Sequence, residues 1–182
     1  LLGLFSIFNT SAINSAELVR DHIPARLSGR TSSILDVQFK EGHMREYHVS
    51  GGLGILSGNL NLEGPIVKDK SSFYLSGKRT YLDLFRDESN PDPDIPDISF
   101  SDVSLKLNAH LNSNNRIYAS VYNGGDRLFD TFSYAWGNRV GSFRWNHLFG
   151  SKAFSNLSYS YSNFYLAQGE GDLSANDTYY QR

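Results

Sequence analysis

The chain has 182 residues, a formal net charge of −2 and no cysteine. The small net charge gives no support to nucleic-acid binding, and the lack of cysteine excludes disulfides and thiolate metal sites. No apolar run approaches the ~20 residues of a membrane helix. The sequence starts at Leu1 without the features of a signal peptide, so we expect a processed chain or a piece of a longer one.

Residues 1–42 differ in pattern from the rest of the chain. Residues 11–19 predict a short helix, which Asn9, Thr10 or Ser11 could cap. A loop punctuated by proline and glycine follows, and residues 34–39 predict a short strand. We therefore expect a small α+β unit at the N-terminus.

From residue 43 onward the sequence shows only strand and turn patterns. Leu105 and Leu107 alternate with Lys106 and Asn108, which predicts a strand with one apolar and one polar face. The predicted strands cover residues 44–55, 58–66, 72–84, 99–111, 116–124, 138–149 and 153–167.

The predicted connections between these strands are of two kinds. Residues 68–71, 112–115 and 149–153 form short polar turns, whereas 86–97 and 123–138 are long, and another long connection begins after residue 168. Short turns that alternate with long loops are typical of outer-membrane barrels. The predicted fold is thus mainly β: an open, curved antiparallel meander of about seven strands from a large transmembrane β-barrel.

A soluble β-sandwich also alternates, so the apolar face could lie against a protein core or against lipid. Three features favour lipid. Many predicted strands have ten or more residues, whereas soluble strands usually have about five or six and a tilted membrane strand needs about 9–11. The polar faces carry few charges, and aromatic residues such as Trp145 and Phe149 gather near strand ends, as in interfacial girdles.

An ordered series of short motifs narrows the class further. The sequence resembles the TonB-dependent outer-membrane receptors of the Bacteroidetes type, nearly end to end through about residue 165. The matching residues are Ile13 and Glu17, Pro24-Ala25-Arg26, Gly29-Arg30, Ser32-Ser33 to Asp36, Lys40-Glu41-Gly42, Glu63-Gly64-Pro65 and Arg79-Thr80-Tyr81. Residues 143–164 look like a later hairpin of the same group.

The resemblance implies a domain division. Residues 1–42 would be the C-terminal part of the plug domain, and residues 43–182 the N-terminal strands of an incomplete barrel. The energy-coupling box would then precede Leu1, and the chain would be an internal fragment of a Gram-negative outer-membrane protein.

The resemblance also implies a receptor and not an enzyme, with no cofactor. Such a receptor binds a scarce nutrient outside the cell and imports it by energy-coupled movement of the plug. Its partners would be outer-membrane lipid, a TonB-type periplasmic protein, a nutrient of unknown class and, in some systems, a surface lipoprotein. Two alternatives stay open: a passive outer-membrane channel, and a soluble all-β binding or adhesion module.

Candidate contact residues follow from the resemblance. Arg26 and Arg30 would face the barrel wall and could pair with Glu63, which lies on the polar face of its strand; alternatively the two arginines only anchor their own loop. Candidate ligand-facing residues of the long loops are Asp92, Asp94, Asp97 and Trp136.

No catalytic or metal site is expected from the sequence. The five histidines show no ligand spacing, and no P-loop, nucleophile elbow or dinucleotide fingerprint is present. The acidic loop 86–97 is dense in oxygen ligands, but it lacks the order of an EF-hand, and a solvated loop stiffened by proline explains it better.

Overall fold

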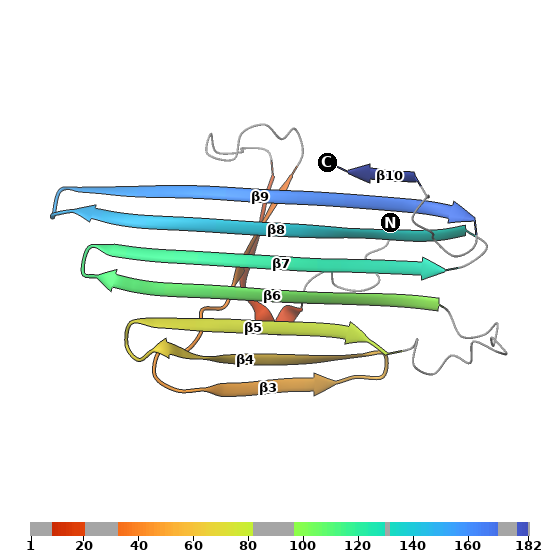
Figure 1. Ribbon diagram of the computed structural model, residues 1–182, viewed down its shortest axis with the longest axis horizontal. Coiled ribbons are helices and arrows are strands. Elements are labelled where there is room, and N and C mark those ends of the chain that lie inside the picture. The colour runs from red at the N-terminus through yellow and green to blue at the C-terminus, as the bar shows by residue number, and fades with distance from the viewer. Residues whose placement is uncertain (1–8, 21–32, 82–96, 130–131, 171–177, 182) are drawn as a thin grey trace.

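The computed structural model describes residues 9–20, 33–81, 97–129, 132–170 and 178–181. These residues form one turn of 3-10 helix, η1 (Thr10–Ala12), and two antiparallel β-sheets (Figure 1). The chain is therefore mainly β, as the sequence predicts. No helix among the described residues is long and apolar enough to cross a membrane.

The larger sheet contains eight antiparallel strands in chain order. They are β3 (His48–Leu53), β4 (Ser57–Val67), β5 (Ser71–Thr80), β6 (Asp97–Asn112), β7 (Asn115–Phe129), β8 (Phe132–Phe149), β9 (Ala153–Glu170) and β10 (Thr178–Gln181). Since β3 and β10 pair with one neighbour each, the sheet is open. The predicted open meander is confirmed: its seven strands correspond to β3–β9, and β10 is an eighth.

The smaller sheet corrects the N-terminal prediction. It pairs β1 (Ile13–Val19) with β2 (Ile34–Phe39), so the strand at 34–39 is confirmed and the helix at 11–19 is wrong. Pairing of Ile13 and Val19 with β2 outweighs the helix propensity of the segment between them. Asn9 is a cap as predicted, but of η1, where its side chain accepts a hydrogen bond from the Ser11 backbone.

The predicted long connection at 123–138 is also wrong. Strand β7 runs to Phe129 and β8 starts at Phe132, so most of that stretch is paired strand. Its glycines make room for tyrosines on the sheet surface. A Cβ at Gly124 would overlap the ring of Tyr122, and one at Gly137 would lie 2.6 Å from the ring of Tyr165.

The three predicted short turns are confirmed. They join β4 to β5, β6 to β7 and β8 to β9, and they lie at one end of the sheet (Figure 1). Asp69 and Gly150 have positive φ values of 61° and 65° in the first and third of these turns, as tight hairpins require. The predicted loop 86–97 lies outside the described residues except for Asp97, where β6 begins.

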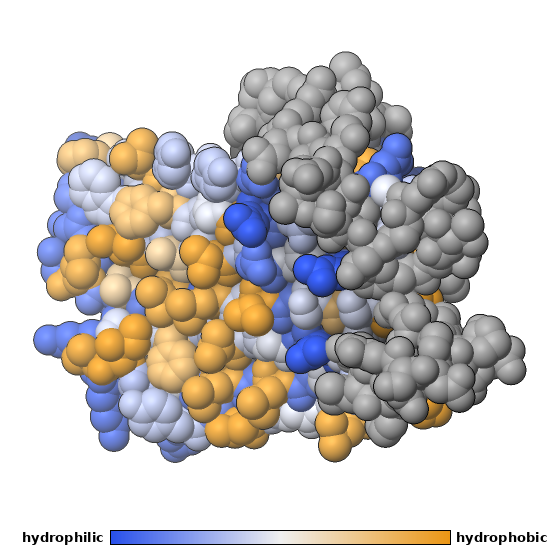
Figure 2. All heavy atoms as spheres, turned by 45° about the vertical axis from the view of Figure 1, so that its right-hand side comes forward, coloured by the Kyte–Doolittle hydropathy of each residue, from blue (hydrophilic) through white to orange (hydrophobic). Residues whose placement is uncertain are grey.

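The register gives the sheet two chemically different faces. On the apolar face Leu62, Leu75, Leu105 and Val121 lie opposite one another across β4–β7. Exposed side chains of this face include Val103, Val121, Phe143, Trp145, Leu157 and Tyr159, whereas Leu105 and Leu107 are half-buried between neighbours. Figure 2 shows apolar side chains gathered next to the short turns. The apolar face predicted from the alternation is therefore confirmed for the described residues, and we call its exposed side chains the apolar patch.

Across β4–β6 the polar face is the buried one. Asn61, Ser72, Ser76 and Asn108 are all less than 5% exposed, although each is polar. They are covered by the N-terminal segment, which we define as residues 9–20 and 33–42. Its hairpin β1–β2 runs across the strands of the larger sheet and not along them (Figure 1). The described part of residues 1–42 therefore lies against the polar face of the sheet.

Candidate functional site

The site is the contact between the N-terminal segment and the polar face of β4–β7, which we call the docking interface. Asn9 lies at its centre and is 3% exposed. Its amide nitrogen donates hydrogen bonds to Asn61 Oδ1 at 3.1 Å and to Ser76 Oγ at 2.7 Å. Its amide oxygen caps η1, so each polar atom of this buried side chain is bonded.

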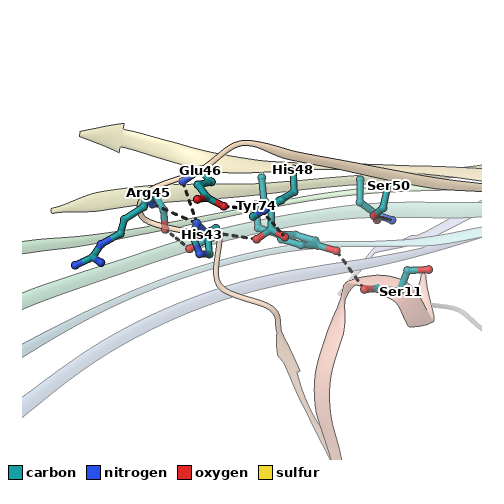
Figure 3. A network of polar contacts seen from close by, with 11 residues as sticks. Ser11, His43, Arg45, Glu46, His48, Ser50 and Tyr74 are labelled. Carbon is teal, nitrogen blue, oxygen red and sulfur yellow. Dashed lines mark hydrogen bonds and ion pairs between the residues drawn. The ribbon is translucent and has the colours of Figure 1, made fainter. Parts of the chain in front are cut away.

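Helix η1 adds a second anchor beside Asn9. The Tyr74 hydroxyl donates a hydrogen bond to the Ser11 carbonyl at 3.1 Å (Figure 3). Ala12 is fully buried. The turn is thus fixed by polar contacts that reach residues more than sixty positions away in the chain.

The end of β2 is anchored by a lysine. Lys106 Nζ donates to the Phe39 carbonyl at 2.8 Å and pairs with the Glu41 carboxylate at 3.3 Å. The Lys106 side chain is 15% exposed and the Glu41 side chain is 50% exposed, so the ion pair is shielded from water only on the lysine side. The Phe39 ring stacks on Tyr122 at 6.2 Å between centroids. Lys106 therefore faces the N-terminal segment, as its place on the polar face predicts.

The segment then passes very close to β5 at Gly42. Ser72 Oγ donates to the Gly42 carbonyl at 2.6 Å, and Asn108 Nδ2 donates to Ser72 Oγ at 2.8 Å. A Cβ at Gly42 would overlap the Phe73 carbonyl. Only glycine therefore fits this crossing without a backbone shift.

Glu63 anchors the next stretch of chain. One carboxylate oxygen accepts a hydrogen bond from the His43 backbone at 2.9 Å, and the other lies 3.8 Å from His48 Nδ1. The His43 ring in turn accepts from the backbone of Arg45 and Glu46 (Figure 3). Glu63 thus holds the exit from the N-terminal segment in place.

Arg26 and Arg30, which could pair with Glu63, lie outside the described residues, so that pairing stays a prediction. Of the loop candidates, Asp92 and Asp94 also lie outside them, and Asp97 is placed only as the first residue of β6.

Trp136 corrects the loop prediction, because it lies within β8. Its indole N–H donates to the Asp126 carboxylate on the polar face. Asp102, which is 5% exposed, lies opposite Lys78 on the same face. The sequence analysis missed both aspartates. Asp102 could have been found from the sequence, because it directly precedes residues 103–111 and continues the polar face of their alternation.

A cavity of about 330 Å³ separates β2 from the polar face of β7–β9. Hydroxyl groups of Ser120, Ser142, Ser158 and Ser160 line it, together with the charged Lys106. Ser120 and Ser142 share a hydrogen bond of 2.7 Å. This surface can hold water or a polar solute. Within the described residues no three His, Asp or Glu side chains are grouped to hold a metal ion.

Asn9→Ala should loosen the docking interface. It removes the donor to Asn61 Oδ1 and to Ser76 Oγ, and an unsatisfied buried polar group costs about 1–3 kcal/mol. We expect faster hydrogen–deuterium exchange in residues 33–42 of the full-length protein. Asn14→Ala is the matched control, because Asn14 is exposed on β1. Equal exchange in both variants would contradict this role of Asn9.

Comparisons with known proteins do not assign the chain. A scan of protein-family models finds no match, and searches of curated proteins and of solved structures return none at a significant level.

Proposed function

We propose that the chain is part of a TonB-dependent outer-membrane receptor of the Bacteroidetes type. Strands β3–β10 belong to the barrel wall, and residues 1–42 are the end of the plug that closes its lumen. The protein binds a scarce nutrient outside the cell and imports it when a TonB-type periplasmic partner moves the plug. It is a transporter and not an enzyme.

The observation that carries this proposal is the inverted burial of the sheet. Polar residues such as Ser72 and Ser76 are 0% exposed, while Val103 is 52% and Tyr159 is 68% exposed. Water would favour the opposite arrangement, since exposed apolar surface costs free energy and large apolar patches are rare on soluble monomers. A hydrocarbon exterior around a closed, wet interior favours the arrangement observed.

The dimensions of the apolar face support the same proposal. On β6 the outward apolar side chains run from Val103 to Leu111. This length matches the about 9–11 residues with which a tilted strand crosses a bilayer. A soluble adhesion module would instead need a second layer over this face.

The docking interface favours a receptor over a passive channel. A passive channel needs an open lumen, whereas here Asn9, Gly42 and Lys106 fix a separate chain segment across the polar face. The contacts are mostly hydrogen bonds to side chains, which an applied pull can exchange for water. The nutrient, the periplasmic partner and a surface lipoprotein would act on parts of the protein beyond this interface.

Sidedness on intact cells tests the proposal. Gln168→Cys, near the end of β9, should react with an impermeant thiol reagent, because this end of the sheet faces outward. Asn114→Cys, in the short turn between β6 and β7, should not react until the outer membrane is opened. The full-length protein should also stay in the membrane fraction until detergent is added.

The negative control is the unsubstituted full-length protein, labelled in parallel; residues 1–182 contain no cysteine. Labelling of Asn114→Cys alone on intact cells would invert the proposed topology. Recovery of the full-length protein as a sharp monomer peak without detergent would refute a membrane location and favour the soluble module.

A further inference from the structure

A cationic groove lies on the outward face of the sheet, on the side of the apolar patch away from the short turns. Arg79 of β5, Arg127 of β7 and Arg139 of β8 line it, and all three side chains are exposed. In the register Arg139 lies opposite Asn123, which lies opposite the apolar Val103. We call this the arginine groove; its volume is about 380 Å³.

Gly125 and Tyr165 form part of its floor. Gly125 and Gly137 lie opposite each other on β7 and β8. A Cβ at Gly125 would lie 2.8 Å from the Tyr165 hydroxyl, and one at Gly137 would lie 2.6 Å from it. The Tyr165 side chain therefore lies across both glycines and lines the groove together with Gly125.

Among the described residues, the charged side chains that line the groove are all arginines. Neither Arg127 nor Arg139 makes an ion pair within the described part of the chain. Asp102 and Asp126 belong to adjoining strands but are on the polar face. Three guanidinium groups thus gather on a chain whose net charge is −2, and planar guanidinium forks suit phosphate oxygens.

The position of the groove selects the source of that phosphate. Along β8 the outward side chains after Arg139 are Gly141, Phe143 and Trp145, so the cationic groove borders the apolar patch directly. A lipid with a phosphorylated head group satisfies both surfaces at once. Its phosphate meets the arginines while its acyl chains lie on Phe143 and its neighbours.

We propose that the arginine groove binds the phosphorylated head group of an outer-leaflet lipid. The inference rests on the proposed function, because it needs the apolar face to contact acyl chains. It adds a lipid site on the outside of the wall, separate from the docking interface and from any nutrient site.

Two closely related lipids test the site. The full-length protein, purified in non-ionic detergent, is titrated with lipid A or with dephosphorylated lipid A, and bound lipid is counted by native mass spectrometry. We expect a preference of about tenfold or more for the phosphorylated form, since hydrogen bonds to charged groups are among the stronger ones. The variant Arg127→Gln/Arg139→Gln should lose this preference. Arg116→Gln/Arg144→Gln, which removes two positive charges from the other face, should keep it.

The outcomes separate the two proposals. A membrane-inserted native protein without preference for lipid A overturns the lipid site and leaves the receptor proposal standing. Equal loss in both double variants also overturns it, because the effect is then one of overall charge. Displacement of lipid A by inorganic phosphate alone identifies a free-anion site instead. Full solubility without detergent overturns the receptor proposal and the lipid site together.

Discussion

Phe143→Arg should prevent most of the full-length protein from assembling in the outer membrane. Phe143 lies on the apolar face between Gly141 and Trp145 and is 40% exposed. In the proposed orientation its side chain contacts lipid near the middle of the bilayer, where an arginine costs about 2–4 kcal/mol. The fraction of protein that resists extraction from the membrane and shows cell-surface labelling measures the effect.

Ser142→Arg is the matched control. It adds the same charge one residue earlier, but Ser142 is exposed on the polar face beside the serine-lined cavity. The substitution sacrifices an exposed hydrogen bond to Ser120 and should assemble almost normally. A corresponding pair on β6, Leu107→Arg and Asn108→Arg, would be less clean, because Asn108 is buried and bonded to Ser72. Equal or reversed defects would show that the two faces are assigned wrongly.

Gly42→Ala should release the N-terminal segment from the sheet. The new Cβ would overlap the Phe73 carbonyl, and overpacking of this kind costs about 1–3 kcal/mol. The backbone must move away from β5, which breaks the hydrogen bond from Ser72 to the Gly42 carbonyl. We expect the full-length protein in planar bilayers to change from closed to conducting.

Gly141→Ala provides the control for this change. A Cβ at Gly141 meets no atom within 4 Å, and the position lies on the apolar face, so the closed state should persist. Trypsin offers a second measurement, since Lys40 in the released segment should become easier to cleave. A Gly42→Ala variant as closed as the native protein would show that this crossing does not hold the segment.

Alternation was the strongest guide in the sequence. The strict pattern around Leu105 and Lys106 predicted both the strand and its two faces, because a residue's face in a strand depends on parity alone. The short turns could be predicted equally well, since their polar residues interrupt that pattern. The antiparallel β class of the chain and the apolar face of its sheet could therefore be predicted from the sequence.

Long-range pairing explains where the sequence analysis was wrong. Residues 13–19 have local helix propensity, but they become strand β1 because β2 supplies hydrogen-bond partners from residues 34–39. Gly124, Gly125 and Gly137 look like turn residues. The structure places them within strands, where the Tyr122 side chain lies against Gly124 and the Tyr165 side chain lies against Gly125 and Gly137. Because Tyr165 is forty positions from Gly125, the sequence near these glycines does not reveal the contact.

Only part of the candidate site could be predicted from the sequence. Lys106 and Glu63 were correctly placed on the polar face, but their partners are backbone atoms of Phe39 and His43. A backbone acceptor carries no residue-type signal, so no motif could reveal it. Asn9 was noticed as a helix cap, yet its bonds to Asn61 and Ser76 depend on how two distant segments meet.

The strands continue well past the arginine groove. Strand β8 extends from Arg139 to Phe132 with β7 and β9 paired alongside through most of that length. At about 3.4 Å per residue and a tilt of about 40°, this part would form a collar about 20 Å tall above the bilayer. In the proposed orientation neither face of the collar contacts lipid, so substitutions there escape the lipid constraint. The connections at this end can then vary in sequence while the part embedded in the bilayer keeps its register.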